Sequence, residues 1–162
     1  MNVDMLTGED AEFATRLWTV CTSAAWQRAV LAGAPYSSVE ALLETSDEAV
    51  SALQPTDLLE ALAGHPRIGE RAEPAHGALA AAEQSGMASA TEQLAQAMRD
   101  GNVAYEKKFD KVYLVCASGL SAEELYARLA ARLDNDRTSE EQVTRSELAK
   151  INRLRLTKLA QG

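Results

Sequence analysis

The sequence is poor in the residues that disulfide and metal sites require. Only two cysteines and two histidines occur among 162 residues. Cys21 and Cys116 lie far apart in the chain and neither belongs to a Cys-x-x-Cys pair, so we expect two buried thiols rather than a disulfide scaffold or a structural zinc site. His65 and His76 lack further Asp, Glu or Cys residues at metal-ligand spacing, and we therefore expect no metal.

Long apolar runs and basic clusters are also missing. No run approaches the roughly 18 residues of a membrane-spanning helix, and the N-terminal segment carries acids instead of the basic start of a signal peptide. The chain ends in Leu-Ala-Gln-Gly, which is not a peroxisomal address. The formal net charge of −8 argues against nucleic acid as a partner and is typical of a surface that favours solubility. We expect a cytoplasmic protein that binds neither membrane nor nucleic acid.

Helix signals dominate what is present. Alanine is abundant, runs of β-branched residues are nearly absent, and apolar residues recur at three- and four-residue spacing. The length suits one domain over residues 1–162, so the sequence predicts an all-α, single-domain bundle of about eight helices. The expected helices span residues 8–22, 23–32, 38–52, 56–63, 76–85, 90–108, 121–133 and 139–160. The strand-like run 112–116 has no partner strand, and we expect an extended or one-turn connector there.

Sequence punctuation separates these helices. The capping-box pattern Ser/Thr-x-x-Glu occurs at Ser37–Glu40, Thr45–Glu48, Ser89–Glu92, Ser121–Glu124 and Thr138–Glu141. Residues 64–74 form the longest predicted loop and are rich in Gly, Pro and charge. Loops held by a rigid scaffold often carry function, so this segment is the first place to look for a site.

His65 stands where a predicted helix ends and this loop begins. Pro66 disfavours the helical conformation at His65, so the backbone sets the direction of the imidazole. Histidine can exchange protons near neutral pH, which suits a general acid or base. An equally simple interpretation is a histidine favoured by the dipole at a helix C-terminus. His76, in a Pro-Ala-His-Gly context, has the character of an ordinary loop residue.

Glu92 and Arg155 are the other charged residues of interest. A capping box with Ser89 would explain Glu92 without any catalysis. Arg155 projects along the apolar stripe that comprises Leu148, Ile151 and Leu159, whereas Arg153 falls on the polar side. A guanidinium on an apolar face needs an anionic or carbonyl partner, which is either a structural ion pair or an acidic substrate.

Taken together, these residues resemble the family of 2-oxo-4-hydroxy-4-carboxy-5-ureidoimidazoline (OHCU) decarboxylases. Family-like pieces occur in the family's order over nearly the whole chain. They are Phe13, Trp26 and Pro35-Tyr36; His65 to Glu70, similar to a His-Pro-x-Ile-Gly loop; Ser89 to Gln93, similar to Ser-x-x-Glu-Gln; Asn102 to Phe109 and the apolar segment Val112 to Ala117; and Lys150 to Leu156, similar to Lys-Ile-x-x-Leu-Arg-Leu. Ala34 and Asp110 depart from the pattern, where the family has arginine and glycine.

The resemblance implies catalytic roles for His65 and Glu92. It further implies substrate contacts from Pro66, Ser89, Gln93 and Arg155 and from the main chain near Tyr113 and Val115. On this interpretation His65 manages the substrate hydroxyl and its proton, Glu92 and Gln93 grip the ureido and ring N–H groups, and Arg155 holds a ring carbonyl or the carboxylate. His65 and Glu92 remain interchangeable as acid and base.

The resemblance also implies a homodimer that acts on the small molecule OHCU, with no metal or organic cofactor, and makes S-allantoin in urate degradation. An alternative function from another class is a non-catalytic helical ligand-binding or regulatory module that retains the family pocket. Intact His65, Glu92 and Arg155 favour the enzyme.

Overall fold

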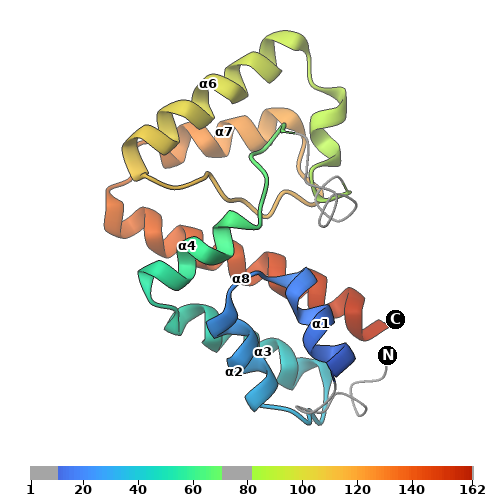
Figure 1. The fold of residues 1–162 in the computed structure, drawn as a ribbon. Coiled ribbons are helices and arrows are strands. Elements are labelled where there is room, and N and C mark those ends of the chain that lie inside the picture. Colours follow the sequence, from blue (N-terminus) through green and yellow to red (C-terminus); the bar gives the residue numbers. More distant parts are fainter. Residues whose placement is uncertain (1–10, 71–81, 162) are drawn as a thin grey trace. The chain divides into compact units, whose positions relative to one another are not determined.

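The computed structural model describes residues 11–70 and 82–161, which form helices joined by short loops and one extended connector (Figure 1). The elements are α1 (Ala11–Val20), α2 (Ala24–Ala32), α3 (Val39–Ala52), α4 (Pro55–Ala63), the 3-10 helix η2 (Ser85–Ser89), α6 (Glu92–Phe109), α7 (Ala122–Arg132) and α8 (Arg137–Gln161). No strand occurs in the described residues, and the prediction of an all-α fold is confirmed.

The predicted helix ranges agree with α1 to α4 and α6 to α8 within a few residues at each end. Most of the predicted helix 76–85, together with His76, lies outside the described residues. Residues 112–116 contain neither helix nor strand, so the predicted connector is confirmed. No helix in the described part of the chain is long and apolar enough to cross a membrane.

The chain divides into two compact units, which we describe separately. The first comprises residues 1–64 and 148–162, and the second comprises residues 65–147. Helix α8 therefore contributes residues to both. The family resemblance supports one functional domain over 1–162, and that single domain stays a prediction.

The first unit has a core of side chains from α1, α2 and α3. Helix α2 packs against α3 and α1. Trp26 is fully buried, and its indole Nε1 donates a hydrogen bond to Ser46 Oγ at 3.1 Å, so the polar end of a large apolar side chain is satisfied inside the core. Phe13, Leu17 and Leu42 are fully buried in the same unit.

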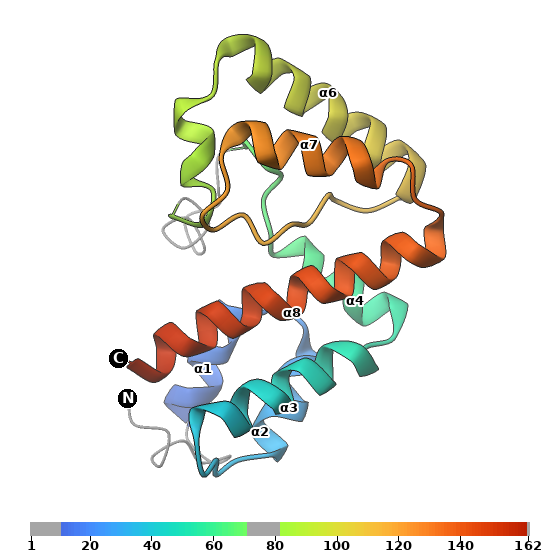
Figure 2. The ribbon, with the colours of Figure 1, turned by 180° about the vertical axis from the view of Figure 1, so that it is seen from behind.

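The second unit is built around α6 and α7, which lie side by side in both views (Figures 1 and 2). Helix η2 also contacts α7. The apolar side chains buried between these elements form one cluster: Ile68, Met98, Tyr105, Phe109, Tyr113, Val115, Ala117, Leu125 and Leu129. The cluster includes members from the loop after α4 and from the connector between α6 and α7, so both irregular segments are fixed by the core.

Asp110 begins this connector and shows how the chain tolerates a departure from the family pattern. Its φ of 57° and ψ of 32° place it in the left-handed conformation that usually ends a helix on glycine. Aspartate adopts this conformation more readily than most residues, and its Oδ2 also lies 3.1 Å from Arg137 Nη2. Asp110, which stands where the family has glycine, therefore preserves the left-handed turn that ends α6.

The predicted capping boxes have mixed outcomes. Ser121 and Glu124 form both hydrogen bonds of a capping box at the start of α7, as predicted. Helix α3 begins one residue later than expected, because Ser38 rather than Ser37 accepts from Ala41 N. The predicted boxes at Thr45 and Thr138 are wrong, since both residues lie inside helices. Asp136 caps α8 instead by accepting from Ser139 N at 2.7 Å.

Candidate active site

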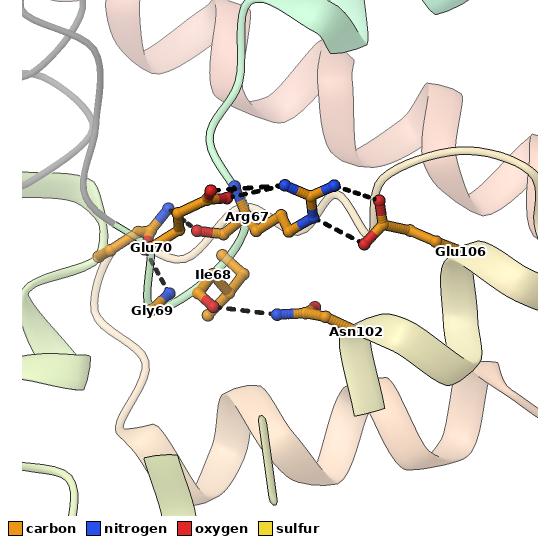
Figure 3. Close-up of polar contacts among 7 residues, drawn as sticks. Arg67, Ile68, Gly69, Glu70, Asn102 and Glu106 are labelled. Carbon is orange, nitrogen blue, oxygen red and sulfur yellow. Dashed lines mark hydrogen bonds and ion pairs between the residues drawn. The ribbon is translucent and has the colours of Figure 1, made fainter. Parts of the chain in front are cut away.

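The loop that follows α4 is fastened to α6 by side chains of both segments (Figure 3). The Arg67 guanidinium makes a two-pronged ion pair with the Glu106 carboxylate, with Nε to Oε2 at 2.8 Å and Nη2 to Oε1 at 2.9 Å. Arg67 also contacts Glu70 within the loop. The planar fork of arginine suits this double contact, which fixes direction as well as distance.

Below this exposed pair, a buried contact holds the loop backbone. Asn102 on α6 is 4% exposed, and its Nδ2 donates to the carbonyl of Ile68 at 3.1 Å (Figure 3). The Ile68 side chain enters the apolar cluster of the second unit. Gly69 has φ of +87°, a conformation that favours glycine, and its N–H donates to Gln84 Oε1 at 2.9 Å. The loop path is therefore set over 67–69, directly after the candidate residues.

His65 and Pro66 open this loop and are half-buried. Helix α4 ends at Ala63, and the N–H of Gly64 bonds back to the carbonyls of Ala61 and Leu62. His65 thus follows the helix cap, as the sequence predicts.

Ser89, Glu92 and Gln93 lie at the junction of η2 and α6, and all three are exposed. The predicted capping box between Ser89 and Glu92 is wrong. Thr91 is the N-cap of α6 and accepts from Leu94 N at 3.1 Å, because Ser89 still belongs to η2 and its hydroxyl contacts Gly86 O. Glu92 is the first helical residue, so a capping box does not account for its carboxylate.

The surface around Glu92 is hollowed. A shallow, open depression of about 680 Å³ is lined by Glu92, Gln93, Gln96, Ala97, Arg99 and Asp100. Glu92 stands at the N-terminus of α6, where the helix dipole favours a negative charge. The exposed Glu92 carboxylate can accept hydrogen bonds at this surface.

Tyr113 and Val115 are buried in the connector between α6 and α7. The Tyr113 hydroxyl donates to the carbonyl of Leu125 at 3.1 Å. Burial raises the pKa of Tyr113 to about 12, so its hydroxyl stays protonated near neutral pH. Its side chain is thus part of the core, which leaves the main chain as the only part of Tyr113 that can meet a substrate.

Arg155 belongs to the first unit, whereas the other seven candidate residues belong to the second. Arg155 is 4% exposed, and its Nη1 donates to the carbonyl of Val20 at 3.0 Å. Arg153 is half-buried and pairs with Asp47 at 2.8 Å. The prediction that Arg155, and not Arg153, shares the buried stripe of α8 is confirmed.

A buried polar network of the second unit was missed from the sequence. Glu140 is 0% exposed and accepts from Arg132 Nε at 2.7 Å and from the Tyr105 hydroxyl at 2.5 Å. A signal for it exists, because Arg132 continues the apolar stripe of Leu125 and Leu129 at helical spacing. The reasoning that singled out Arg155 applies equally to Arg132. Cys21 is buried as expected, whereas Cys116 is only partly buried.

The fold places the chain in a class of all-α domains with known members. It is similar to the crystal structure of an OHCU decarboxylase in the presence of (S)-allantoin, with a TM-score of 0.79 and 28% identity over 91% of this chain and 99% of that chain. It shares its fold with the crystal structure of an (S)-allantoin synthase, with a TM-score of 0.74 and 19% identity over 98% of this chain and 54% of that chain.

Sequence comparison narrows the class to a family. The chain is 31% identical over 148 residues to the uric acid degradation bifunctional protein TTL of Arabidopsis thaliana, covering 88% of this chain. It spans only 46% of that relative's length. Residues 7–157 match the family model for OHCU decarboxylase. The chain belongs to the OHCU decarboxylase family.

The loop contacts generate a stability prediction based on two changes between an acid and its amide. Asn102→Asp replaces the Nδ2 donor with an oxygen facing the Ile68 carbonyl, and burying that carboxylate should cost about 3 kcal/mol near pH 7. Glu106→Gln weakens an exposed pair and should cost less than about 1 kcal/mol. Urea unfolding measures both.

The pH dependence provides the control for this prediction. Burial raises the folded-state pKa of the introduced carboxyl above its unfolded value, so the protonated form is favoured on folding. The stability deficit of Asn102→Asp should therefore shrink as pH falls towards the ordinary pKa of aspartate and grow as pH rises through the raised pKa. Equal, pH-independent losses in both variants would contradict the anchoring role of Asn102.

Proposed function

We propose that this chain decarboxylates OHCU to (S)-allantoin and CO2 in urate degradation. The observation that carries the proposal is the family match over residues 7–157, which includes the loop that begins at His65. A solved relative of the same fold, similar over almost its whole length, was crystallised with (S)-allantoin. The occurrence of His65, Glu92 and Arg155 in the family's order along the sequence supports the same activity.

The chemistry of this substrate suits a site built from side chains alone. The carboxylate is attached to a carbon that also bears a hydroxyl and adjoins a C=N bond. When the bond to the carboxylate breaks, its electron pair forms a C=C bond to the neighbouring carbon while the C=N pair moves onto nitrogen. That nitrogen and the neighbouring carbon each take up a proton, and the hydroxyl loses its proton to become the carbonyl of allantoin, so one proton is consumed overall. The substrate is its own electron sink, so the protein has to supply orientation and proton transfer.

The candidate residues divide these tasks. His65 receives the hydroxyl proton and takes part in protonating the neighbouring carbon, with its direction set by Pro66 and the anchored loop. Glu92 and Gln93 accept hydrogen bonds from the ureido and ring N–H groups through their side-chain oxygens, and Ser89 and Pro66 add further contacts to the substrate. Arg155 holds a ring carbonyl or the carboxylate with its fork of donors. The resemblance supports a cytoplasmic homodimer, whose oligomeric state sedimentation equilibrium would test.

The first functional prediction is activity itself. Because OHCU is unstable, it is generated in situ from urate by the two upstream enzyme activities. The purified protein should then accelerate formation of (S)-allantoin, followed by circular dichroism, even after exhaustive treatment with a chelator. Racemic allantoin formed at the spontaneous rate would reject the enzyme and favour a binding module. Activity that returned only with added metal would reveal a metal site.

The second functional prediction concerns Glu92. Glu92→Gln should lower kcat by about a hundredfold or more, because a positioned acid or base typically contributes 10² to 10⁴ in rate. The melting temperature should hardly move, because the carboxylate is exposed and its interaction with the helix dipole stabilises the fold by about 1 kcal/mol at most. Glu123→Gln, at an exposed acid in the first turn of α7, is the matched control. A clear loss of stability with a nearly normal rate would return Glu92 to a structural role.

The third functional prediction compares two arginines of one helix. Arg155→Lys should lower kcat/KM at least tenfold, because lysine keeps the charge but loses the paired, planar hydrogen bonds. Arg153→Lys should leave kcat/KM within a few-fold of wild type, since Arg153 pairs with Asp47 and Glu40 on a half-exposed face. Steady-state kinetics on both variants decide the matter, and equal effects would show that the substrate-binding arginine is wrongly assigned.

A further inference from the structure

The connector between α6 and α7 has to satisfy its main chain without a neighbouring strand. Leu114 and Val115 are buried, so their peptide groups need partners other than bulk water. Two side chains from helices supply such partners. Arg132 Nη1 on α7 donates to the carbonyl of Leu114, and Glu147 Oε1 on α8 accepts from the N–H of Cys116 at 3.2 Å.

The arginine of this pair is rigidly held. The buried Glu140 carboxylate accepts from Arg132 through Oε1, and its Oε2 accepts from Asn135 Nδ2 at 3.0 Å. Desolvation alone would lower the pKa of Arg132, but the hydrogen bond and charge of Glu140 outweigh it and raise the pKa. The guanidinium therefore stays charged, and it also lies 4.8 Å from the centre of the Tyr113 ring. Its Nη1 is fixed as a donor towards the connector.

These contacts fall on one edge of the connector. The side chains of Tyr113, Val115 and Ala117 all enter the core cluster, which is the two-residue repeat of an extended chain. In an extended chain the N–H and C=O of one residue point to the same edge, and those of the next residue point to the opposite edge. Residues 114 and 116 therefore face Arg132 and Glu147. The N–H and C=O groups of residues 113 and 115 therefore point to the opposite edge.

We propose that Arg132 and Glu147 are positioning residues that turn the N–H and C=O of Val115 towards the substrate ring. The inference rests on the proposed function and deepens it by naming what orients the main-chain part of the site. OHCU and allantoin both carry adjacent N–H and C=O groups in a ring amide. One residue of an extended edge offers a complementary N–H and C=O pair, as it would to a neighbouring strand.

Glu147 gives the sharper test, because changing it leaves the Arg132–Glu140 ion pair intact. Glu147→Ala removes the acceptor for Cys116 N–H and should lower kcat/KM at least tenfold, with binding of (S)-allantoin, measured by calorimetry, weakened by a similar factor. Glu147→Gln keeps an acceptor oxygen at the same reach and should stay within about threefold of wild type in both measurements. Glu141→Ala, a change at a half-buried acid of the same helix, should match wild type.

Glu147→Asp supplies a second variant that keeps the charge but shortens the reach by one methylene. It should lose kcat/KM and (S)-allantoin affinity in parallel, as Glu147→Ala does. Wild-type kcat/KM and affinity in folded Glu147→Ala or Glu147→Asp would overturn the positioning role, even if the melting temperature fell. Wild-type protein that neither forms nor binds (S)-allantoin would overturn the proposed function and this inference with it, so the two failures are distinguishable.

Discussion

The carboxylate of Glu140 connects three helices of the second unit. It lies on α8 and accepts hydrogen bonds from Tyr105 on α6 and Arg132 at the end of α7. Both charges of the Arg132–Glu140 pair are nearly or fully buried, and desolvating them is costly unless each donor and acceptor finds a partner. Tyr105 and Asn135 donate the remaining hydrogen bonds to the Glu140 carboxylate. The Leu114 carbonyl and the Thr144 hydroxyl accept hydrogen bonds from the Arg132 guanidinium. Loss of either charged partner would leave an uncompensated buried charge, which typically lowers the free energy of unfolding by about 3–5 kcal/mol.

Hydrogen bonds from helix side chains are also needed elsewhere in this unit, because the segments around the candidate site are irregular. The loop after α4 and the connector before α7 have no regular ladder of main-chain hydrogen bonds, so side chains from helices must define their paths. Helix α6 does this for the loop through Asn102 and Glu106, and α7 and α8 do it for the connector. Helix α6 also carries Glu92 at its first residue. The spacing between Glu92 and the loop anchors is thus fixed by a single rigid helix.

Sequence patterns predicted the helices well because periodic burial determines them locally. The connector was predicted for an equally local reason, since a strand without a partner cannot form a sheet. The start of α6 was predicted less well. Thr91 and Ser89 both suit an N-cap, but Ser89 belongs to η2, which contacts α7, and α6 begins after Thr91. The N-cap of α3 is Ser38, one residue after the predicted Ser37. The sequence cannot separate these two adjacent serines, because both suit an N-cap.

The two buried arginines show where sequence reasoning on a candidate site ends. Arg155 and Arg132 each continue an apolar helical stripe, and each donates to a main-chain carbonyl at the edge of irregular backbone, that of Val20 and that of Leu114. Helical spacing identifies both as buried but does not distinguish a substrate-binding role from a positioning role. For Arg132 the distinction comes from Glu140, eight residues later and on the next helix. The pairing depends on how α7 and α8 meet, and a helical wheel drawn for either helix alone contains no information about that meeting. The role of a buried charge therefore depends on its partner on another helix, whereas its burial can be predicted from the apolar spacing of its own helix.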